Sequence, residues 1–488
     1  MVKNMEDLIN YLNRIGQLNY LSTILRWEMD TIVPSKSYDY LIDISTKIDL
    51  ESFKLSTSDK LIELINKIDI NGLNDLDRTY LTNLKEDYER FKLIPEDFYQ
   101  EYSKLKNNSL NAWVRAKDEN NYGIFKPYLI SIIESTKKFY RYMYPNTNNL
   151  YDEMLSTYEK GINTELVDKL FNELKLNIKP IIDNLKPKDL NKSTKKYSDS
   201  ELINISKYLL NYIGFDNSRG ALGIYTHGYT IKLNDNDVRI AFSRESDIFD
   251  HMSTIIHEGG HGIFEQNISD ELKKYKCYDI DKVALHESQS RFYENILGRN
   301  INFWIPIYDD IKNLLNINLD INDFMDMFNN AKTSLIRTKA DELTYCMHII
   351  IRYEIEKEIF NGNIDLENLD KIWNQKYKEY LGIDIINDKD GILQDMHWSD
   401  GSFGYFPTYL LGSIFDGMLL EKINNDLGNI DLLLREGRIK EITAYLNKNI
   451  HMFGGTYNIN EVSNRLFGCN LAVKPIINYF KNKYGKEI

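Results

Sequence analysis

The chain has 488 residues and a formal net charge of −13, with 42% hydrophobic and 27% charged side chains. This is the composition of a soluble globular protein, and a length well beyond the size at which one hydrophobic core stops growing predicts two lobes. The acidic balance argues against nucleic acids and anionic membranes as partners, because both favour a basic surface.

Residues 1–20 lack the apolar core of a signal peptide, and no run in the chain approaches the roughly 18 apolar residues of a membrane span. The three cysteines, Cys277, Cys346 and Cys469, are odd in number and far apart. Neither a disulfide framework nor a CxxC metal site is therefore expected. These features favour a cytoplasmic protein.

Residues 1–200 are predicted to form one helix after another. Glycine (25) and proline (9) are scarce for this length, and both residues break helices. The stretch 165–185 places apolar side chains on one helical face. These side chains are Leu166, Leu170, Phe171, Leu174, Ile178 and Ile181.

Residues 224–242 break the helical period. The sequence alternates, reaches an Asn-Asp-Asn-Asp turn at 234–237 and alternates again, which predicts a β-hairpin. The edge of such a hairpin can pair with an extended peptide. A plain surface hairpin is the alternative interpretation.

The segment 251–266, HMSTIIHEGGHGIFEQ, is predicted to form a helix with a metal site. His257 and His261 then lie on one face and can offer two imidazole nitrogens to one ion. Zinc lowers the pKa of bound water towards 7, and Glu258 is placed to take its proton during attack on a carbonyl. The two glycines between the histidines suggest close backbone approach. A pair of solvated helix histidines is the alternative.

A third protein ligand must come from elsewhere, because catalytic zinc usually has three. Residues 281–299 are predicted to form a second helix, which offers His286, Glu287 and Glu294. Glu287 would complete a His₂Glu set. Glu294 is the competing ligand, and a surface carboxylate is the alternative role for Glu287.

Residues 337–356 are predicted to form a third helix with a polar stripe. The stripe consists of Asp341, Tyr345, His348 and Arg352 at a spacing of three to four residues. On an otherwise apolar helix it indicates the wall of a wet cleft. As an alternative, Tyr345 and His348 are satisfied interior groups.

The stretch 391–413 is predicted to be a glycine-containing loop that leads into a helix. It concentrates polar and aromatic side chains, namely Gln394, Asp395, His397, Trp398, Tyr405 and Tyr409. A tyrosine hydroxyl close to the zinc could stabilise a tetrahedral oxyanion.

Taken together, these motifs resemble those of the Taq-type, or thermostable, metallocarboxypeptidase family, which are helical HExxH zinc peptidases. The matching segments are HExxH at 257–261, HESQ at 286–289, I/V-R-x-x-A/S-D at 336–341 and GxxQDxHW at 391–398, with further likeness at 18–34 and 151–161. The resemblance implies a mostly α, two-lobed peptidase fold like that of neurolysin and angiotensin-converting enzyme. It also implies a deep active-site groove and a small β-sheet or hairpin beside the metal helix. A single catalytic domain would span 1–488, with a helical part at about 1–200 and the metal and substrate motifs at about 224–413.

The resemblance also implies roles for individual residues. The metal ligands would be His257, His261 and Glu287. Glu258 would be the general base, and His397 with Tyr409 would line the subsite and polarise the scissile carbonyl, with Tyr405 as the alternative tyrosine. The expected cofactor is one Zn²⁺ per subunit, with Co²⁺ or Mn²⁺ as alternatives. The expected partners are peptide substrates and a second copy of the chain in a homodimer.

Two family motifs are altered in this chain. The family's HPF is His227-Gly228-Tyr229 here, and its DxRxT ends in Ala241 instead of threonine. Both changes fall in the predicted hairpin. We expect them to affect substrate positioning and side-chain preference, because no metal ligand or base is lost.

A carboxypeptidase must hold a terminal carboxylate, and the planar guanidinium of arginine matches that group. Arg337 lies in a family motif and is the first choice, and Arg239 on the hairpin is the second. An ion pair from Arg337 to Asp341, one helical turn on, is the alternative. The remaining candidates for substrate binding are Arg352, His227, Gln394 and Tyr405.

The expected function is the removal of single carboxyl-terminal residues from peptides with broad specificity. An oligopeptidase or dipeptidyl-carboxypeptidase on the same scaffold is one alternative. A metal-binding scaffold that has lost catalysis is another, although the presence of Glu258 argues against it, since binding zinc needs no general base.

Overall fold

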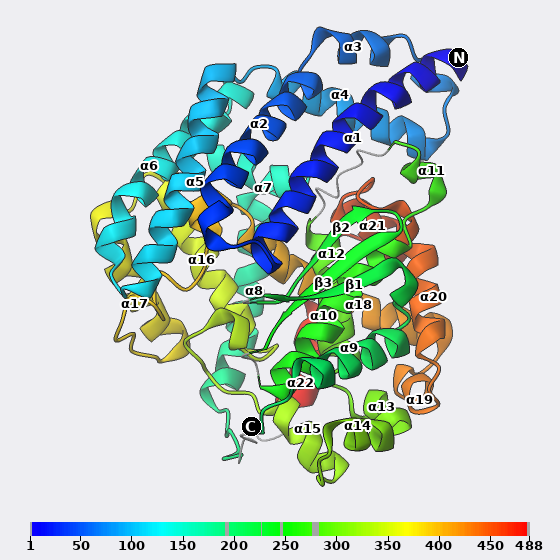
Figure 1. The fold of residues 1–488 in the computed structure, drawn as a ribbon. Coiled ribbons are helices and arrows are strands. Elements are labelled where there is room, and N and C mark those ends of the chain that lie inside the picture. The colour runs from blue at the N-terminus through cyan, green and yellow to red at the C-terminus, as the bar shows by residue number, and fades with distance from the viewer. Residues whose placement is uncertain (1, 191–194, 226, 245–246, 276–282, 486–488) are drawn as a thin grey trace.

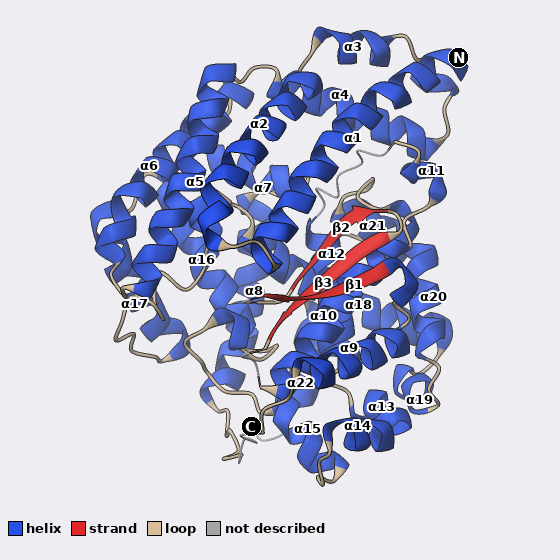
Figure 2. Cartoon of the chain, viewed as in Figure 1, coloured by secondary structure: helices blue, strands red, loops and turns tan. Residues whose placement is uncertain are grey.

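The computed structural model describes the chain except for residues 1, 191–194, 226, 245–246, 276–282 and 486–488. The described residues are mostly helical and contain one small sheet (Figures 1 and 2). The prediction of a mostly α fold with a small sheet is therefore confirmed. No described helix combines the length and the apolarity needed to cross a membrane.

The first part of the chain is an array of helices, as predicted. Polar side chains cap many of them: Asn74, Asn121, Asn149 and Asn163 each accept a hydrogen bond from a backbone amide of the first turn, which satisfies an otherwise unpaired donor. The helices are α1 (Val2–Thr31), α2 (Tyr38–Ser56), α3 (Asp59–Asn66), α4 (Asp75–Phe91), α5 (Glu96–Asp118), α6 (Tyr122–Met143), α7 (Leu150–Tyr158), α8 (Thr164–Asp183) and α9 (Asp199–Ile213).

The predicted apolar face of α8 is buried, because five of its six side chains enter the main hydrophobic core. These five are Leu170, Phe171, Leu174, Ile178 and Ile181. A separate, smaller cluster of buried side chains joins α1, α3 and α4 and includes Leu8, Leu12, Leu61, Leu64 and Leu81.

The sheet has three strands, β1 (Gly220–Tyr225), β2 (Tyr229–Asn234) and β3 (Asp237–Ser243), in the order β1-β3-β2. β2 and β3 are antiparallel and turn between Asn234 and Asp237, so the predicted hairpin is confirmed there. Its first strand was predicted too early, because Ile224 and Tyr225 belong to β1, which pairs with β3 in parallel. The fully buried Val238, Ile240 and Phe242 of β3 suit a central strand with neighbours on both sides.

The sheet lies along α10 (Ile248–Gln266), which carries both metal-motif histidines (Figure 1). The second half of the chain continues as helices. They are α11 (Asp270–Lys273), α12 (Val283–Arg291), α13 (Ile301–Trp304), α14 (Tyr308–Leu315), α15 (Ile321–Asn329), α16 (Tyr345–Asn361), α17 (Leu369–Leu381), α18 (Phe406–Leu427), α19 (Ile430–Arg435), α20 (Ile439–Asn449), α21 (Ile459–Phe467) and α22 (Lys474–Tyr484).

Glycines bring α10, α12 and α18 together backbone to backbone. A Cβ atom on Gly260 of α10 would lie 2.7 Å from Cα of Ser290, and one on Gly412 of α18 would lie 2.8 Å from N of Ser288. No real side chain tolerates such contacts. The close approach expected from the glycines of the metal motif is thus found, and it brings α12 within side-chain reach of α10.

Two predicted helices differ from the structure. In the stretch 281–299, residues 281 and 282 lie outside the described residues, α12 ends at Arg291, and a π-helical segment follows at Phe292–Leu297. In the stretch 337–356 the prediction of one helix is wrong, because α16 begins only at Tyr345. Asp341 accepts hydrogen bonds from the backbone amides of Leu343 and Thr344 and so holds the chain in a turn before the helix.

Candidate metal centre

Three side chains from α10 and α12 converge in one place: His257, His261 and Glu287. Their ligand atoms all lie within 4.8 Å of one another, and Nε2 of His261 is 3.9 Å from Oε1 of Glu287. Oε2 of Glu287 is buried and has no hydrogen-bond partner among the described residues. A buried carboxylate oxygen of this kind calls for a cation, and two imidazoles with one carboxylate fit zinc.

Glu294, the competing candidate, lies outside this cluster and contacts the ligand His257 on the side away from the metal position. Its Oε2 is 2.8 Å from Nδ1 of His257, so the far nitrogen Nε2 is left for the ion. Burial lowers the pKa of His257, but the hydrogen bond and charge of Glu294 raise it to about 9. Glu287 lies on α12, and Glu294 lies in the π-helical segment Phe292–Leu297 that follows it. Such segments are frequent at functional sites.

His286 supports the second ligand from behind. Its ring stacks on that of His261 with centroids 4.4 Å apart, and the Nδ1 atoms of the two rings are hydrogen-bonded. Nε2 of His286 lies 3.2 Å from Oε1 of Glu265. The sequence offered His286 as a possible ligand. In this structure His286 instead orients His261, and Nε2 of His261 is left for a metal ion.

Glu258 lies on the metal helix α10, on the side covered by the sheet, and is 7% exposed. The hydroxyl of Thr230 on β2 lies 2.8 Å from its Oε2. Burial raises the pKa of Glu258, which suits a group that takes up a proton near neutral pH. Sequence reasoning missed Thr230; the only signal was its position two residues after the altered Gly228.

His397 and Tyr409 meet although they come from different elements, the 3-10 helix His397–Asp400 and α18. Nε2 of His397 is 3.2 Å from the hydroxyl of Tyr409, and the rings of Tyr405 and Tyr409 lie 5.3 Å apart. Burial and the neighbouring Arg337 lower the pKa of His397 to about 3, so its ring is neutral. Burial also raises the pKa of Tyr409, and the neighbouring Tyr405 and Glu287 raise it further.

Arg337 is 7% exposed and is held by two side chains. Its Nε donates to Asp395 at 2.9 Å, and its Nη1 donates to the hydroxyl of Tyr345 at 2.9 Å. Among the described residues no hydrogen bond engages its Nη2. The alternative ion pair with Asp341 is wrong, because that carboxylate caps the turn before α16 instead.

Arg352 and Gln394 hold Arg337 and its partner Asp395 in place through hydrogen bonds. Arg352 is fully buried, and it donates to Asp395 at 2.7 Å and to Oε1 of Gln394 at 2.9 Å. Oε1 of Gln394 also accepts from the backbone amide of Arg337. The predicted wet cleft wall on this helix is therefore wrong: Tyr345, His348 and Arg352 are buried, and His348 bonds to the hydroxyl of Tyr377 at 3.0 Å.

The two remaining candidates lie on the sheet. Arg239 makes two hydrogen bonds to Asp237, at 2.9 and 2.8 Å, and its guanidinium lies 5.6 Å from the ring of Trp27 on α1. Because Arg239 is next to Ile240, the partner of Thr230, it points to the opposite face of the sheet from Thr230. His227 is exposed between β1 and β2, and its charge is among the causes that lower the pKa of His397.

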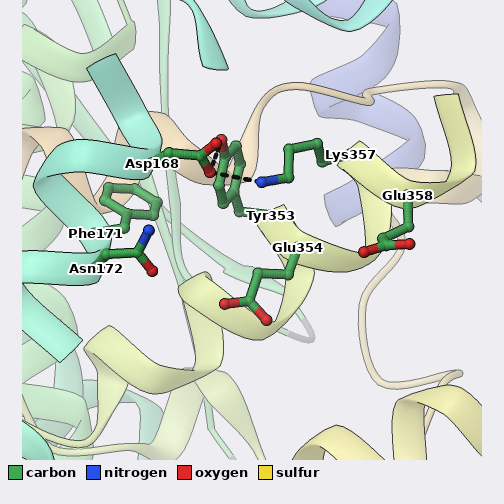
Figure 3. A pocket seen from close by; sticks show the side chains of 7 residues that line it. All are labelled: Asp168, Phe171, Asn172, Tyr353, Glu354, Lys357 and Glu358. Carbon is green, nitrogen blue, oxygen red and sulfur yellow. Dashed lines mark hydrogen bonds and ion pairs between the residues drawn. The ribbon is translucent and has the colours of Figure 1, made fainter. Parts of the chain in front are cut away.

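A surface pocket between α8 and α16 contains none of these residues (Figure 3). Its two central charged groups, Asp168 and Lys357, are paired at 2.6 Å, and the hydroxyl of Tyr353 donates to Asp168 at 2.8 Å. Since these groups satisfy one another, the pocket is not a candidate catalytic site.

Comparison with known proteins gives consistent matches along the whole chain. The family model described as "Carboxypeptidase Taq (M32) metallopeptidase" matches residues 7–484. Carboxypeptidase 1 of Bacillus subtilis is 35% identical over 490 residues, which is 98% of this chain and 97% of the relative. Thermostable carboxypeptidase 1 of Thermus thermophilus is 28% identical, with 98% of each chain covered.

Solved structures agree with this match. A crystal structure described as BsuCP superposes with a TM-score of 0.90 at 34% identity and covers 99% of both chains. The M32 carboxypeptidase of Deinococcus radiodurans R1 superposes with a TM-score of 0.92 at 23% identity, again over 99% of both chains, and supports the fold.

Proposed function

Because this chain belongs to the carboxypeptidase Taq (M32) metallopeptidase family, we propose that it removes single residues from the carboxyl termini of peptides with broad specificity. The family predicted from the motifs is confirmed, and the chain is a metallocarboxypeptidase with a candidate His-His-Glu metal site. The observation that carries the proposal is the buried guanidinium of Arg337, whose Nη2 has no hydrogen bond among the described residues. It lies 5.1 Å from the ring of Tyr409.

We assign one ion per subunit to His257, His261 and Glu287. Zinc fits this donor set, with cobalt or manganese as alternatives. When bound there, the ion supplies Lewis acidity at the scissile carbonyl and compensates developing negative charge. The chain's own residues then move the protons and hold the peptide.

Glu258 is the proposed general base. Its carboxylate accepts a proton from the attacking water and returns it to the departing amine nitrogen. Glu258 lies on the ligand helix α10 itself and is 7% exposed, so its carboxylate has little contact with bulk water.

Tyr409 is the proposed donor to the oxyanion. Nδ1 of His397 is buried and has no hydrogen-bond partner among the described residues, which favours the tautomer with its proton on Nε2, because an unpaired N–H costs free energy. That N–H donates to the oxygen of Tyr409. The tyrosine's own proton is then free for the substrate carbonyl as negative charge develops.

Arg337 is the proposed receptor for the terminal carboxylate. Asp395 and Tyr345 fix two of its nitrogens, so the guanidinium is already oriented when the peptide arrives. We now assign Arg352 and Gln394 a supporting role, because their polar atoms bond to Asp395, Arg337 and backbone carbonyls.

The remaining candidates have lesser roles in the proposal. Tyr405 and His227 stay as residues lining the subsite. Arg239 is a weaker candidate than the sequence suggested, since it faces α1 and is already paired with Asp237.

The test is mass analysis of peptides incubated with the zinc-loaded protein. A free peptide should lose one residue at a time from its carboxyl end. Acetylating the amino terminus should change little, whereas amidating the carboxyl terminus should slow cleavage strongly. The reverse pattern would indicate an aminopeptidase. Equal cleavage of both blocked peptides would indicate an endo-acting oligopeptidase. Loss of residues in pairs would indicate a dipeptidyl-carboxypeptidase. Zinc binding without cleavage would indicate an inactive scaffold.

A homodimer and a cytoplasmic location belong to the same proposal. Light scattering should then give a mass about twice the 57.5 kDa of one chain. A mass of one chain at working concentration would contradict the dimer.

A further inference from the structure

We propose that Thr230 is a positioning residue for Glu258: its hydroxyl holds Oε2, so that Oε1 is the atom that takes and returns the proton. The inference rests on the proposed role of Glu258 as general base. In this proposal the hairpin positions the general base, a role that is separate from any contact with substrate.

The geometry ties Glu258 to β2 at two points. Oγ1 of Thr230 lies 2.8 Å from Oε2 of Glu258 and 2.9 Å from the backbone oxygen of the same residue. Thr230 pairs with Ile240 in the register of β2 and β3, and Ile240 packs close to Gly262 of α10. The threonine therefore lies on the sheet face that covers α10, where its single hydroxyl proton is shared between the backbone oxygen and Oε2 of the base.

The other carboxylate oxygen has no such partner. Among the described residues no hydrogen bond engages Oε1 of Glu258. Next to it lies Gly228, at which a Cβ atom would be 3.4 Å from Oε1 and 2.3 Å from Cγ2 of Thr254. The second distance would force the side chain of Thr254 to shift. The glycine that replaces the family's proline thus leaves room beside Oε1.

This asymmetry suits a base that must act twice. In the ionised state Thr230 donates to Oε2. When the attacking water loses a proton, its O–H bond breaks and an Oε1–H bond forms. The water oxygen bonds to the carbonyl carbon as the C=O π pair moves onto the carbonyl oxygen, which becomes the oxyanion. Oε2 is then the carbonyl oxygen of a neutral acid and still accepts from Thr230.

The carboxyl group therefore does not need to rotate before its second step. The Oε1–H bond breaks and the proton bonds to the amide nitrogen. The C–N bond then breaks as the oxyanion pair re-forms the C=O bond. A shortened peptide and a free amino acid result, and Glu258 is ionised again. A carboxylate free to rotate would lose part of this preorganisation.

The decisive variant is Thr230→Val, which removes the hydroxyl at similar shape. We expect kcat on a free peptide to fall on the order of 10- to 100-fold, as for a lost hydrogen bond to a charged group. KM and bound zinc should stay near wild type, and Thr230→Ser should restore most of kcat. Thr82→Val, at an exposed site on α4, is the matched control. If the valine variant does not fold, Thr230→Ala takes its place.

A double variant separates positioning from a general structural effect. In a Glu258→Gln background, Thr230→Val should have little further effect on residual turnover, because residues that act as a unit are not additive. Three outcomes would overturn the inference. They are a wild-type kcat in Thr230→Val, a Thr230→Ser variant as slow as Thr230→Val, and fully additive losses of turnover in the double variant. A wild-type protein that binds zinc but cleaves no peptide would instead refute the proposed function, and this inference with it.

Discussion

Oε2 of Glu294 lies 2.8 Å from Nδ1 of His257, so a carboxylate holds the far side of an imidazole whose other nitrogen faces Glu287 and His261. The same helical segment thus supplies both a candidate ligand and a support for a ligand. The pair also explains why two glutamates seven residues apart are needed at one metal site.

Replacing these two glutamates should have different effects on metal binding. Glu287→Ala should lose bound zinc, because it removes a ligand atom. Glu294→Ala should keep the site but weaken zinc binding about 10- to 100-fold, as expected for an outer partner of a ligand histidine. Zinc affinity is measured by chelator competition. Glu294→Gln, which keeps an acceptor oxygen for Nδ1–H, is the matched control and should lie between wild type and alanine. Full zinc in Glu287→Ala with none in Glu294→Ala would reverse the assignment.

Glu258→Gln should leave zinc content and folding unchanged while turnover falls on the order of 10²- to 10⁴-fold. The amide has nearly the same shape but takes up no proton. Zinc is quantified by mass spectrometry and turnover by release of free amino acid. A variant with near wild-type turnover would show that another group acts as the base.

Arg337→Met should abolish the discrimination between a free and an amidated carboxyl terminus. In the wild type the ratio of kcat/KM values should be about 10- to 100-fold in favour of the free acid, the range for charge-assisted hydrogen bonds. In the variant the ratio should approach one, and Arg352 still pairs with Asp395 to hold the site. Arg438→Met, at an exposed ion pair with Glu436 and Glu441, is the control. If the preference for the free carboxyl terminus persists in Arg337→Met, Arg337 is not the carboxylate receptor and Arg239 becomes the next candidate.

Glu356 should make stability depend on pH. It is fully buried, and it accepts from Tyr151, Trp398 and the backbone amide of Gly404 at 2.7–2.8 Å. Burial raises its pKa from 4.5 to about 7, although these donors oppose the shift. The folded state therefore binds more protons than the unfolded state between these values, and stability falls as pH rises through this range.

The check is urea unfolding of wild type and Glu356→Gln from pH 4.5 to 8, because glutamine does not titrate. The stability of wild type relative to the variant should fall by roughly 3 kcal/mol over the interval, at 1.36 kcal/mol per pKa unit. A difference that stays constant would mean that the three donors keep Glu356 ionised throughout.

The sequence by itself determined the features that depend on local period. Apolar side chains at helical spacing predicted α8, and two histidines four residues apart can share a helix face whatever surrounds them. The turn at residues 234–237 was visible because its side chains favour that backbone. The ordered motifs were also sufficient to predict the family, which the match over residues 7–484 confirms.

Only the tertiary structure decided which side chains meet across elements. Glu287 and Glu294 are equivalent candidates by spacing, and they differ because Gly260 allows backbone contact at Ser290 and a π-helical turn follows. Arg337 had a partner one turn away by helical reasoning, yet only a short 3-10 helix, Arg337–Lys339, forms there and α16 begins at Tyr345. Arg337 instead pairs with Asp395, 58 residues on. Thr230 meets Glu258 only because the sheet lies on α10. Such contacts depend on packing distances between elements, and the periodicity of a single segment contains no information about them.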